Sequence, residues 1–175
     1  MIVLFEKILV PIDGSEHSLR ALTSATQLAK NSNGKISLLS VCKIEEETTF
    51  DSVGGDESLR TDSDASSMLS VHGAELRVAS TMNPTAYSDV IKCMREASKQ
   101  ILANGEKSVK DAGVQVETLA REGNVVDEIL KEAKSGKFNL VVMGSRGLSR
   151  IRELALGSVA DAVMRHSPIP VLVVK

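Results

Sequence analysis

Short apolar runs alternate with longer stretches of helical periodicity along most of the chain. The run at residues 7–12 (KILVPI) stops at Asp13 and Gly14, which is typical of a buried strand that enters a turn. Comparable runs predict further strands at 36–42, 114–119, 138–143 and 170–174. The nearly continuous apolar character of most of these runs indicates strands that are covered on both faces of a sheet.

Amphipathic helices are predicted between the strands. Ser15 is suited to cap a first helix, which ends at residues 31–34 and has an apolar face formed by Leu19, Leu22, Ala25, Leu28 and Ala29. A second helix is expected from Tyr87 to Asp111, and a third lies between Gly123 and Gly136. The last helix is predicted at 157–166.

The segment at about 43–84 does not fit this alternation. It is rich in Ser, Thr, Asp, Glu and Gly, with only scattered apolar residues. Its length is unusual for a loop within a compact domain. We therefore expect a variable polar insertion, which is either mobile or contains short helices.

The alternation of strands and helices predicts an α/β fold. Parallel strands need crossover connections, and these are nearly always right-handed, so helices cover both faces of the sheet. We expect residues 1–175 to form a single Rossmann-like, doubly wound domain whose five parallel strands have the order 3-2-1-4-5. In that order the first and fourth strands are neighbours where the winding direction reverses, and ligands bind at such a position.

Charge and cysteine content narrow the possible partners. The 175-residue chain has a formal net charge of −2, and without a basic field we expect neither nucleic acid nor an anionic membrane surface as a partner. A small ligand or a protein is favoured. The amino-terminal residues lack the pattern of an export signal, and Cys42 and Cys93 lack the spacing of a disulfide framework. These features favour a cytoplasmic protein.

A glycine-punctuated segment follows the predicted fourth strand. Gly144 and Gly147 are separated by two residues, and nine further residues lead to Gly157 and Ser158. This G-x2-G-x9-G-[ST] spacing resembles the nucleotide signature of ATP-binding universal stress proteins. The resemblance extends to ILVPIDGS at the start of the chain and PVLVVK at its end, so only the insertion at 43–84 lies outside it.

The glycines also have a physical rationale of their own. Gly144 and Gly147 lack a Cβ, so their backbone N–H groups can approach phosphate oxygens, and they permit a positive φ where the loop turns. Gly157 and Ser158 are expected at the start of the last helix, where free N–H groups and the helix dipole favour an anion. The Ser158 hydroxyl would add a donor.

The resemblance implies a complete binding site. Asp13 would bind the ribose hydroxyls, while Pro11 and Val41 would line the adenine pocket, with the Val41 backbone bonding the base edge. Met143 and Val159, which flank the motif, complete the predicted set. The implied ligand is ATP with Mg²⁺, the implied role is regulation in stress physiology, and no catalytic or metal-ligating residue is predicted. We also expect a homodimer, because Val171–Val174 would be an apolar strand at the sheet edge.

Simpler readings remain open at this stage. The glycines could merely form a turn, Ser158 could merely cap a helix, and Asp13 could serve an Asx turn with Ser15. Arginines in the loop, at 146, 150 and 152, could bind phosphate or be solvated. The three histidines are expected on the surface or at helix caps.

Two other functions are also possible on the sequence. One is a slow ATPase or nucleotide-dependent transferase, although the chain has no G-x4-G-K-[ST] motif. The other is a dimeric scaffold that binds no nucleotide, against which the intact glycine pattern counts.

Overall fold

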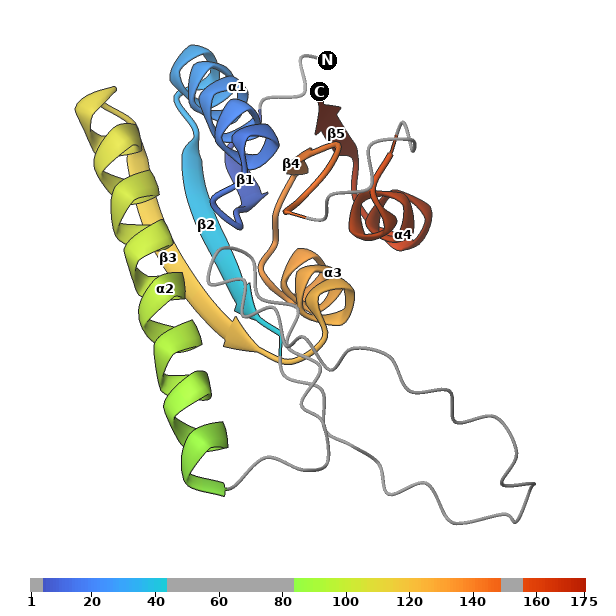
Figure 1. Ribbon diagram of the computed structural model, residues 1–175. Helices are drawn as coiled ribbons and strands as arrows, with labels where there is room; N and C mark the ends of the chain where they lie inside the picture. Colours follow the sequence, from blue (N-terminus) through green and yellow to red (C-terminus); the bar gives the residue numbers. More distant parts are fainter. Residues whose placement is uncertain (1–4, 44–83, 149–155) are drawn as a thin grey trace.

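The computed structural model describes residues 5–43, 84–148 and 156–175. Within these ranges strands and helices alternate from one end to the other, as Figure 1 shows. The strands are β1 (Lys7–Pro11), β2 (Lys35–Cys42), β3 (Gln115–Glu122), β4 (Leu140–Gly144) and β5 (Val171–Val174). The helices are α1 (Glu16–Ser32), α2 (Pro84–Asp111), α3 (Val125–Ser135) and α4 (Ser158–His166). The expected insertion falls almost entirely outside the described residues.

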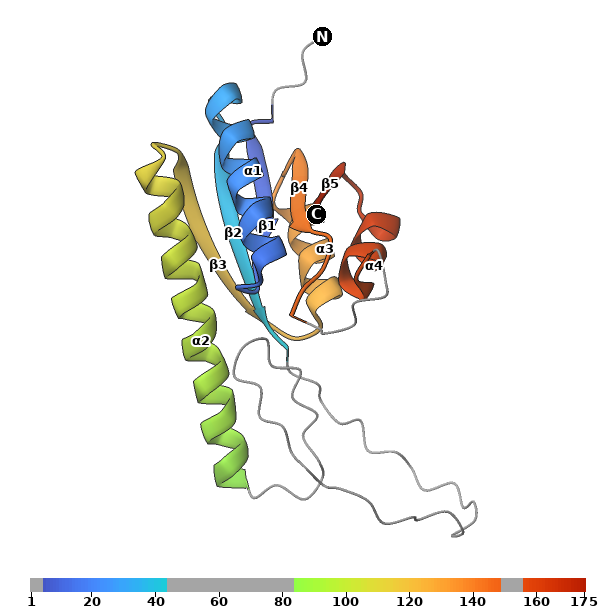
Figure 2. The ribbon, with the colours of Figure 1, turned by 45° about the horizontal axis from the view of Figure 1, so that its top comes forward.

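All five strands belong to one parallel sheet with the order β3-β2-β1-β4-β5. The predicted α/β fold and strand order are therefore confirmed. Helices α1 and α2 lie on one face of the sheet, and α3 and α4 lie on the other (Figure 2). Because β1 and β4 are neighbours, their carboxyl ends form the position at which the winding direction reverses.

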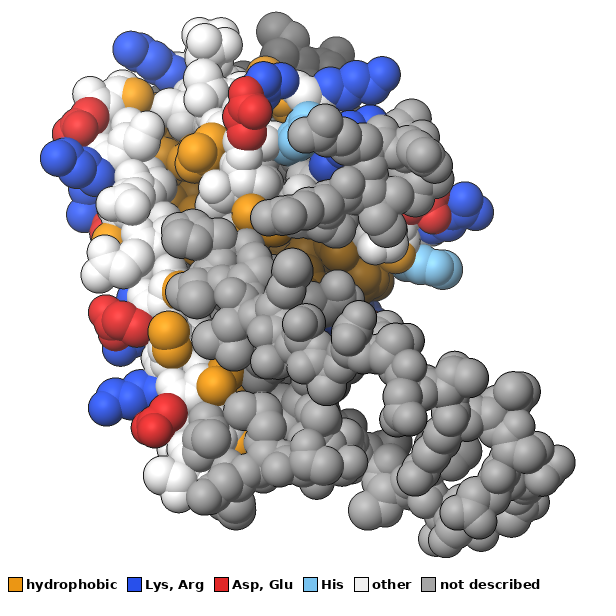
Figure 3. Space-filling model, in the orientation of Figure 1, with side chains coloured by type: hydrophobic (Ala, Val, Ile, Leu, Met, Phe, Trp, Pro, Cys, Tyr) orange, Lys and Arg blue, Asp and Glu red, His pale blue; other side chains and the backbone are white. Residues whose placement is uncertain are grey.

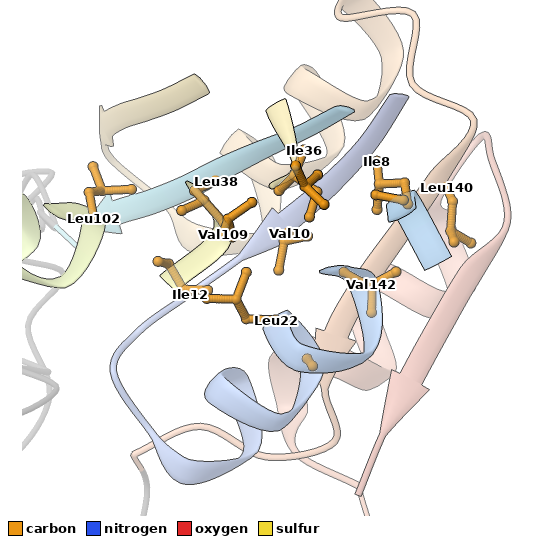
Figure 4. Packing of buried hydrophobic residues seen from close by; sticks show 14 residues of the cluster. Ile8, Val10, Ile12, Leu22, Ile36, Leu38, Leu102, Val109, Leu140 and Val142 are labelled. Carbon is orange, nitrogen blue, oxygen red and sulfur yellow. The ribbon is translucent and has the colours of Figure 1, made fainter. Parts of the chain in front are cut away.

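Alternate residues of the central strands supply two separate hydrophobic clusters. Ile8, Val10, Ile36, Leu38 and Val142 point toward α1 and α2, where they meet Leu22, Leu102 and Val109 (Figure 4). Leu9, Leu39, Val141 and Met143 point the other way, toward α3 and α4. This period of two follows from the pleat of the strands and explains why apolar side chains occupy both faces of the central strands.

Helix α1 begins as its sequence predicts, and its buried face includes Leu22, Ala25 and Ala29 of the predicted set. The Ser15 side chain accepts a hydrogen bond from the Ser18 N–H, which caps the helix. Leu19, however, is 48% exposed, so the expectation that it belongs to the buried face is wrong. The buried residues are Ser18, Ala21, Leu22, Ala25 and Ala29. Small residues let the helix lie close to the sheet, and the buried Ser18 hydroxyl is satisfied because it donates to the Ser15 carbonyl at 2.9 Å.

The predicted bounds differ most at the edge of the sheet and at α2. Strand β3 continues to Glu122 because it pairs with β2 along its whole length, although its outer positions are polar. Helix α2 begins at Pro84 rather than at Tyr87, because proline is well suited to the first turn of a helix.

In the part of the chain that the structure describes, no helix has the length and apolarity needed to cross a membrane.

Candidate functional site

Asp13 lies just beyond the carboxyl end of β1. Its Oδ1 atom accepts a hydrogen bond of 2.9 Å from the Ser15 N–H, so the Asx turn considered from the sequence is present. The intervening Gly14 has φ +81°, a left-handed conformation that favours glycine. This local turn uses one carboxylate oxygen and holds the side chain in place, so the other oxygen, Oδ2, remains available.

The Oδ2 atom of Asp13 faces the glycine loop. A Cβ built on Gly147 would lie 2.7 Å from this oxygen, so the loop backbone and the carboxylate are in close contact. The fold thus brings together two residues of the predicted binding set that come from opposite ends of the chain. Gly147 is needed for this approach, because any side chain there would displace Asp13 or the loop.

Gly144 is required by packing rather than by an unusual backbone conformation. The described glycines with positive φ are Gly14, Gly113 and Gly123, so the expectation of a positive φ at Gly144 and Gly147 is wrong. A Cβ on Gly144 would lie 2.7 Å from the backbone carbon of His17 in the first turn of α1. Glycine at this position therefore lets the helix approach the end of β4 closely.

The start of α4 borders the same loop. Gly157 is the N-cap residue, and its N–H donates to the Ser145 carbonyl at 2.7 Å. The expectation that the Gly157 N–H is free is therefore wrong. The next three residues, Ser158, Val159 and Ala160, have N–H groups without intrahelical acceptors. These donors, together with the positive end of the helix dipole, favour an anion beside the loop.

A backbone edge of β2 is exposed beyond the end of β1. The Leu39 carbonyl accepts from the Ile12 N–H at 2.8 Å, so the backbone groups of Leu39 face β1. Residues two apart in a strand direct these groups to the same side, and those of Val41 therefore face the space where β1 has ended. Val41 presents one N–H donor and one carbonyl acceptor in that space.

The apolar members of the predicted set gather on one side of the sheet. Met143 is buried in the cluster beneath α3 and α4, and Val41 and Val159 pack against it. Pro11, the last residue of β1, is half-buried. In Figure 3 hydrophobic side chains are visible on the surface between α3 and α4. The carboxyl end of the sheet therefore combines an apolar surface with N–H donors and a carboxylate.

Several candidate residues lie elsewhere. Arg150 and Arg152 fall outside the described residues, as does His72, whereas Arg146 is described and half-buried. His166 ends α4, at the opposite end of that helix from the loop. Among the described residues no cluster of three His, Cys, Asp or Glu side chains could hold a metal ion.

Cys42, next to Val41, is not suited to be a nucleophile. Its side chain is buried against α2, and burial raises the pKa of the thiol, with a further contribution from Glu122. A raised pKa disfavours the reactive thiolate.

The sequence matches known proteins over nearly its whole length. The profile of the universal stress protein family matches residues 4–175. The chain belongs to the universal stress protein family. Universal stress protein YxiE of Bacillus subtilis is 34% identical over 173 residues, which cover 98% of this chain and 100% of YxiE.

Solved universal stress proteins share the fold. UspA of Lactobacillus plantarum superposes with a TM-score of 0.73 at 18% identity, covering 99% of this chain and all of that one. A universal stress protein solved in complex with cAMP has a TM-score of 0.58 at 25% identity, covering 98% and 97% of the two chains. This neighbour shows that a universal stress protein of this fold binds an adenine nucleotide.

His17 is the residue of this region that sequence reasoning missed. We expected a surface or capping histidine, but its backbone and Cβ contact Gly144 at the start of the loop. No local pattern could have indicated this contact, because it depends on how α1 packs against β4.

Proposed function

We propose that this universal stress protein binds ATP at the carboxyl ends of β1 and β4 and acts as a regulatory protein of the cytoplasmic stress response. The observation that carries the proposal is the contact between Asp13 and Gly147, beside the start of α4. It joins a carboxylate suited to ribose hydroxyls with N–H donors suited to phosphate. Membership of the family and the cAMP complex of a neighbour support an adenine nucleotide as the ligand.

The phosphates would lie between the glycine loop and α4. The N–H groups of Ser158 and Val159 would donate to their oxygens, with the Ser158 hydroxyl as a further donor. The lack of a side chain at Gly147 and Gly157 would let the loop backbone approach the same phosphates. Mg²⁺ commonly retains several waters and is bound largely by substrate phosphates. It would therefore accompany ATP without a dedicated set of protein ligands.

The base would meet the exposed backbone edge of Val41. Adenine presents an acceptor and a donor side by side on its Watson–Crick edge, which match the N–H and carbonyl groups of this residue. Guanine presents a donor and an acceptor in the reverse arrangement, and it would leave these groups unpaired. Pro11, Met143 and Val159 would supply the apolar surroundings.

We expect ATP to bind at least about 100-fold more tightly than GTP, since two mispaired polar groups each cost about 1–3 kcal/mol.

Asp13→Ala should lower the affinities for ATP and for adenosine alike, by roughly tenfold or more, because the ribose contact is common to both ligands. Isothermal calorimetry measures the affinities of the unchanged protein for ATP, GTP and adenosine, and those of Asp13→Ala for ATP and adenosine. Asp13→Asn is the matched control, because it retains the side-chain oxygen that caps the Asx turn.

Different results would contradict the role of Val41 and the role of Asp13. Equal affinities for ATP and GTP would reject the role of Val41, whereas an unchanged affinity of Asp13→Ala would reject the role of Asp13. If no nucleotide binds the folded protein and none co-purifies with it from cells, the protein is instead a scaffold that binds no nucleotide.

ATP should be bound without efficient turnover. Phosphoryl transfer requires a positioned nucleophile and charge stabilisation in the transition state, whereas a phosphate cradle stabilises the ground state and transition state similarly. The segment from Gly144 to Ser158 contains serines and arginines but no lysine or histidine. We expect phosphate release below roughly 1 s⁻¹, the low end of typical enzyme turnover.

A coupled phosphate-release assay with Mg²⁺ tests this expectation. Faster release that disappears in Gly147→Val would show that the protein is an ATPase at this site. Release that persists in this variant would come from a contaminating enzyme.

We further propose a homodimer through β5. This strand is at the edge of the sheet, and its Leu172 side chain is 39% exposed. An unpaired apolar edge strand favours pairing with another chain, and a two-fold axis would close the assembly at two copies.

A further inference from the structure

The imidazole of His17 contains a buried polar atom without a partner. Of the side chains that the structure describes, this Nδ1 nitrogen is the one buried oxygen or nitrogen that makes no hydrogen bond. Such atoms are rare in folded proteins, because a buried polar atom that loses its contact with water and gains no partner destabilises the fold. An unpaired atom of this kind calls for a functional or structural explanation.

The backbone and Cβ of the same residue lie against the glycine loop. His17 is the second residue of α1, and its backbone and Cβ lie within 2.9 Å of a Cβ built on Gly144. Gly144 is the first glycine of the loop. A change in the loop at this point is therefore transmitted directly to the first turn of α1, and the reverse also holds.

Other contacts hold the start of the loop in place. The Ser145 N–H donates to the Val174 carbonyl at 2.7 Å, and the Ser145 carbonyl accepts from the Gly157 N–H at 2.7 Å. The loop is thus attached to β5 and to the cap of α4, while on the α1 side it meets His17 by packing. The residue that makes this contact is the one whose buried Nδ1 lacks a partner.

We propose that His17 is a positioning residue for the phosphate loop, and that its Nδ1 gains a hydrogen bond from the loop when nucleotide binds. This inference rests on the proposed function. Phosphate draws the loop N–H groups into a defined arrangement, and the energy recovered by pairing a buried atom then favours the bound arrangement. Removing Nδ1 should therefore weaken nucleotide binding without unfolding the protein.

A pair of substitutions separates the hydrogen bond from the bulk of the ring. His17→Asn retains a polar atom near the position of Nδ1, whereas His17→Gln places its polar atoms near that of Nε2. We expect the affinity for ATP to fall about tenfold in His17→Gln and to remain within about twofold of the unchanged protein in His17→Asn. His166→Gln, on an exposed histidine at the far end of α4, should have no effect.

A spectroscopic measurement gives an independent readout. In protein labelled with ¹⁵N-histidine, saturation with ATP should shift the Nδ1 resonance of His17, assigned by its loss in His17→Gln, and leave that of His166 unchanged. Tight ATP binding with an unmoved His17 resonance, or equal affinities in the Asn and Gln variants, would overturn this inference alone. Failure of the unchanged protein to bind ATP would overturn the proposed function as well.

Discussion

Gly147→Val is expected to reduce the affinity for ATP by at least about 100-fold while leaving the fold intact. A Cβ at this position would lie 2.7 Å from Asp13 Oδ2, so the valine must displace either the carboxylate or the loop. The same side chain would enter the space beside α4 in which we place the phosphates. Ribose and phosphate contacts are therefore lost together, each charge-assisted hydrogen bond contributing about 1.5–3 kcal/mol.

The fold should tolerate this change. Gly147 is exposed, and its φ is not among the positive values that favour glycine. The thermal unfolding midpoint without nucleotide should therefore change little, while ATP should no longer raise it as it does in the unchanged protein.

Gly113→Asn is the matched control. Gly113 follows α2 with φ +78°, which asparagine tolerates, and a Cβ there would meet no atom within 4 Å. This variant should bind ATP with unchanged affinity. If folded Gly147→Val retains the affinity of the unchanged protein in calorimetry, the assignment of the glycine loop to phosphate is wrong.

Val173→Pro is expected to convert the proposed homodimer into a folded monomer. On β5 the carbonyls of Pro170 and Val174 accept hydrogen bonds from Val141 and Ser145. Backbone groups alternate along a strand, so those of Val171 and Val173 face away from the sheet. Proline at position 173 removes an N–H that faces away from the sheet and leaves the hydrogen bonds between β5 and β4 in place. Proline is tolerated at such positions of edge strands.

In a two-fold dimer the substitution removes two hydrogen-bond donors, because each copy loses one at the same interface. We expect the dimer dissociation constant to rise at least about 100-fold, as measured by sedimentation equilibrium. Val173→Ile, which retains the N–H and the β-branched side chain, should remain dimeric. Leu172→Pro should act differently, because it removes an N–H that faces β4 and should lower the stability of the fold.

Sedimentation of the unchanged protein as a monomer at micromolar concentration would reject the homodimer. A dimer that persists in Val173→Pro would place the interface on another surface of the molecule.

The sequence by itself determined the fold class and the elements that contain the motif. Apolar runs of strand length alternate with helical periodicity, and parallel strands joined by helices permit few topologies, so the sheet order was predictable. Asp13 and the glycine segment were found because turns and helix starts use particular residues at particular spacings. The exact face of α1 was not predictable, because only the packing of the helix against the sheet leaves Leu19 exposed and buries Ser18 instead.

Only the tertiary structure decided how the candidate site is assembled. The need for glycine at 144 and 147 arises from His17 and Asp13, residues distant in the chain that approach because β4 lies beside β1. The open backbone edge of Val41 exists because β1 ends before β2 does. A local pattern records the preferences of neighbouring residues, whereas these contacts depend on how strands of unequal length and their helices pack around the same end of the sheet.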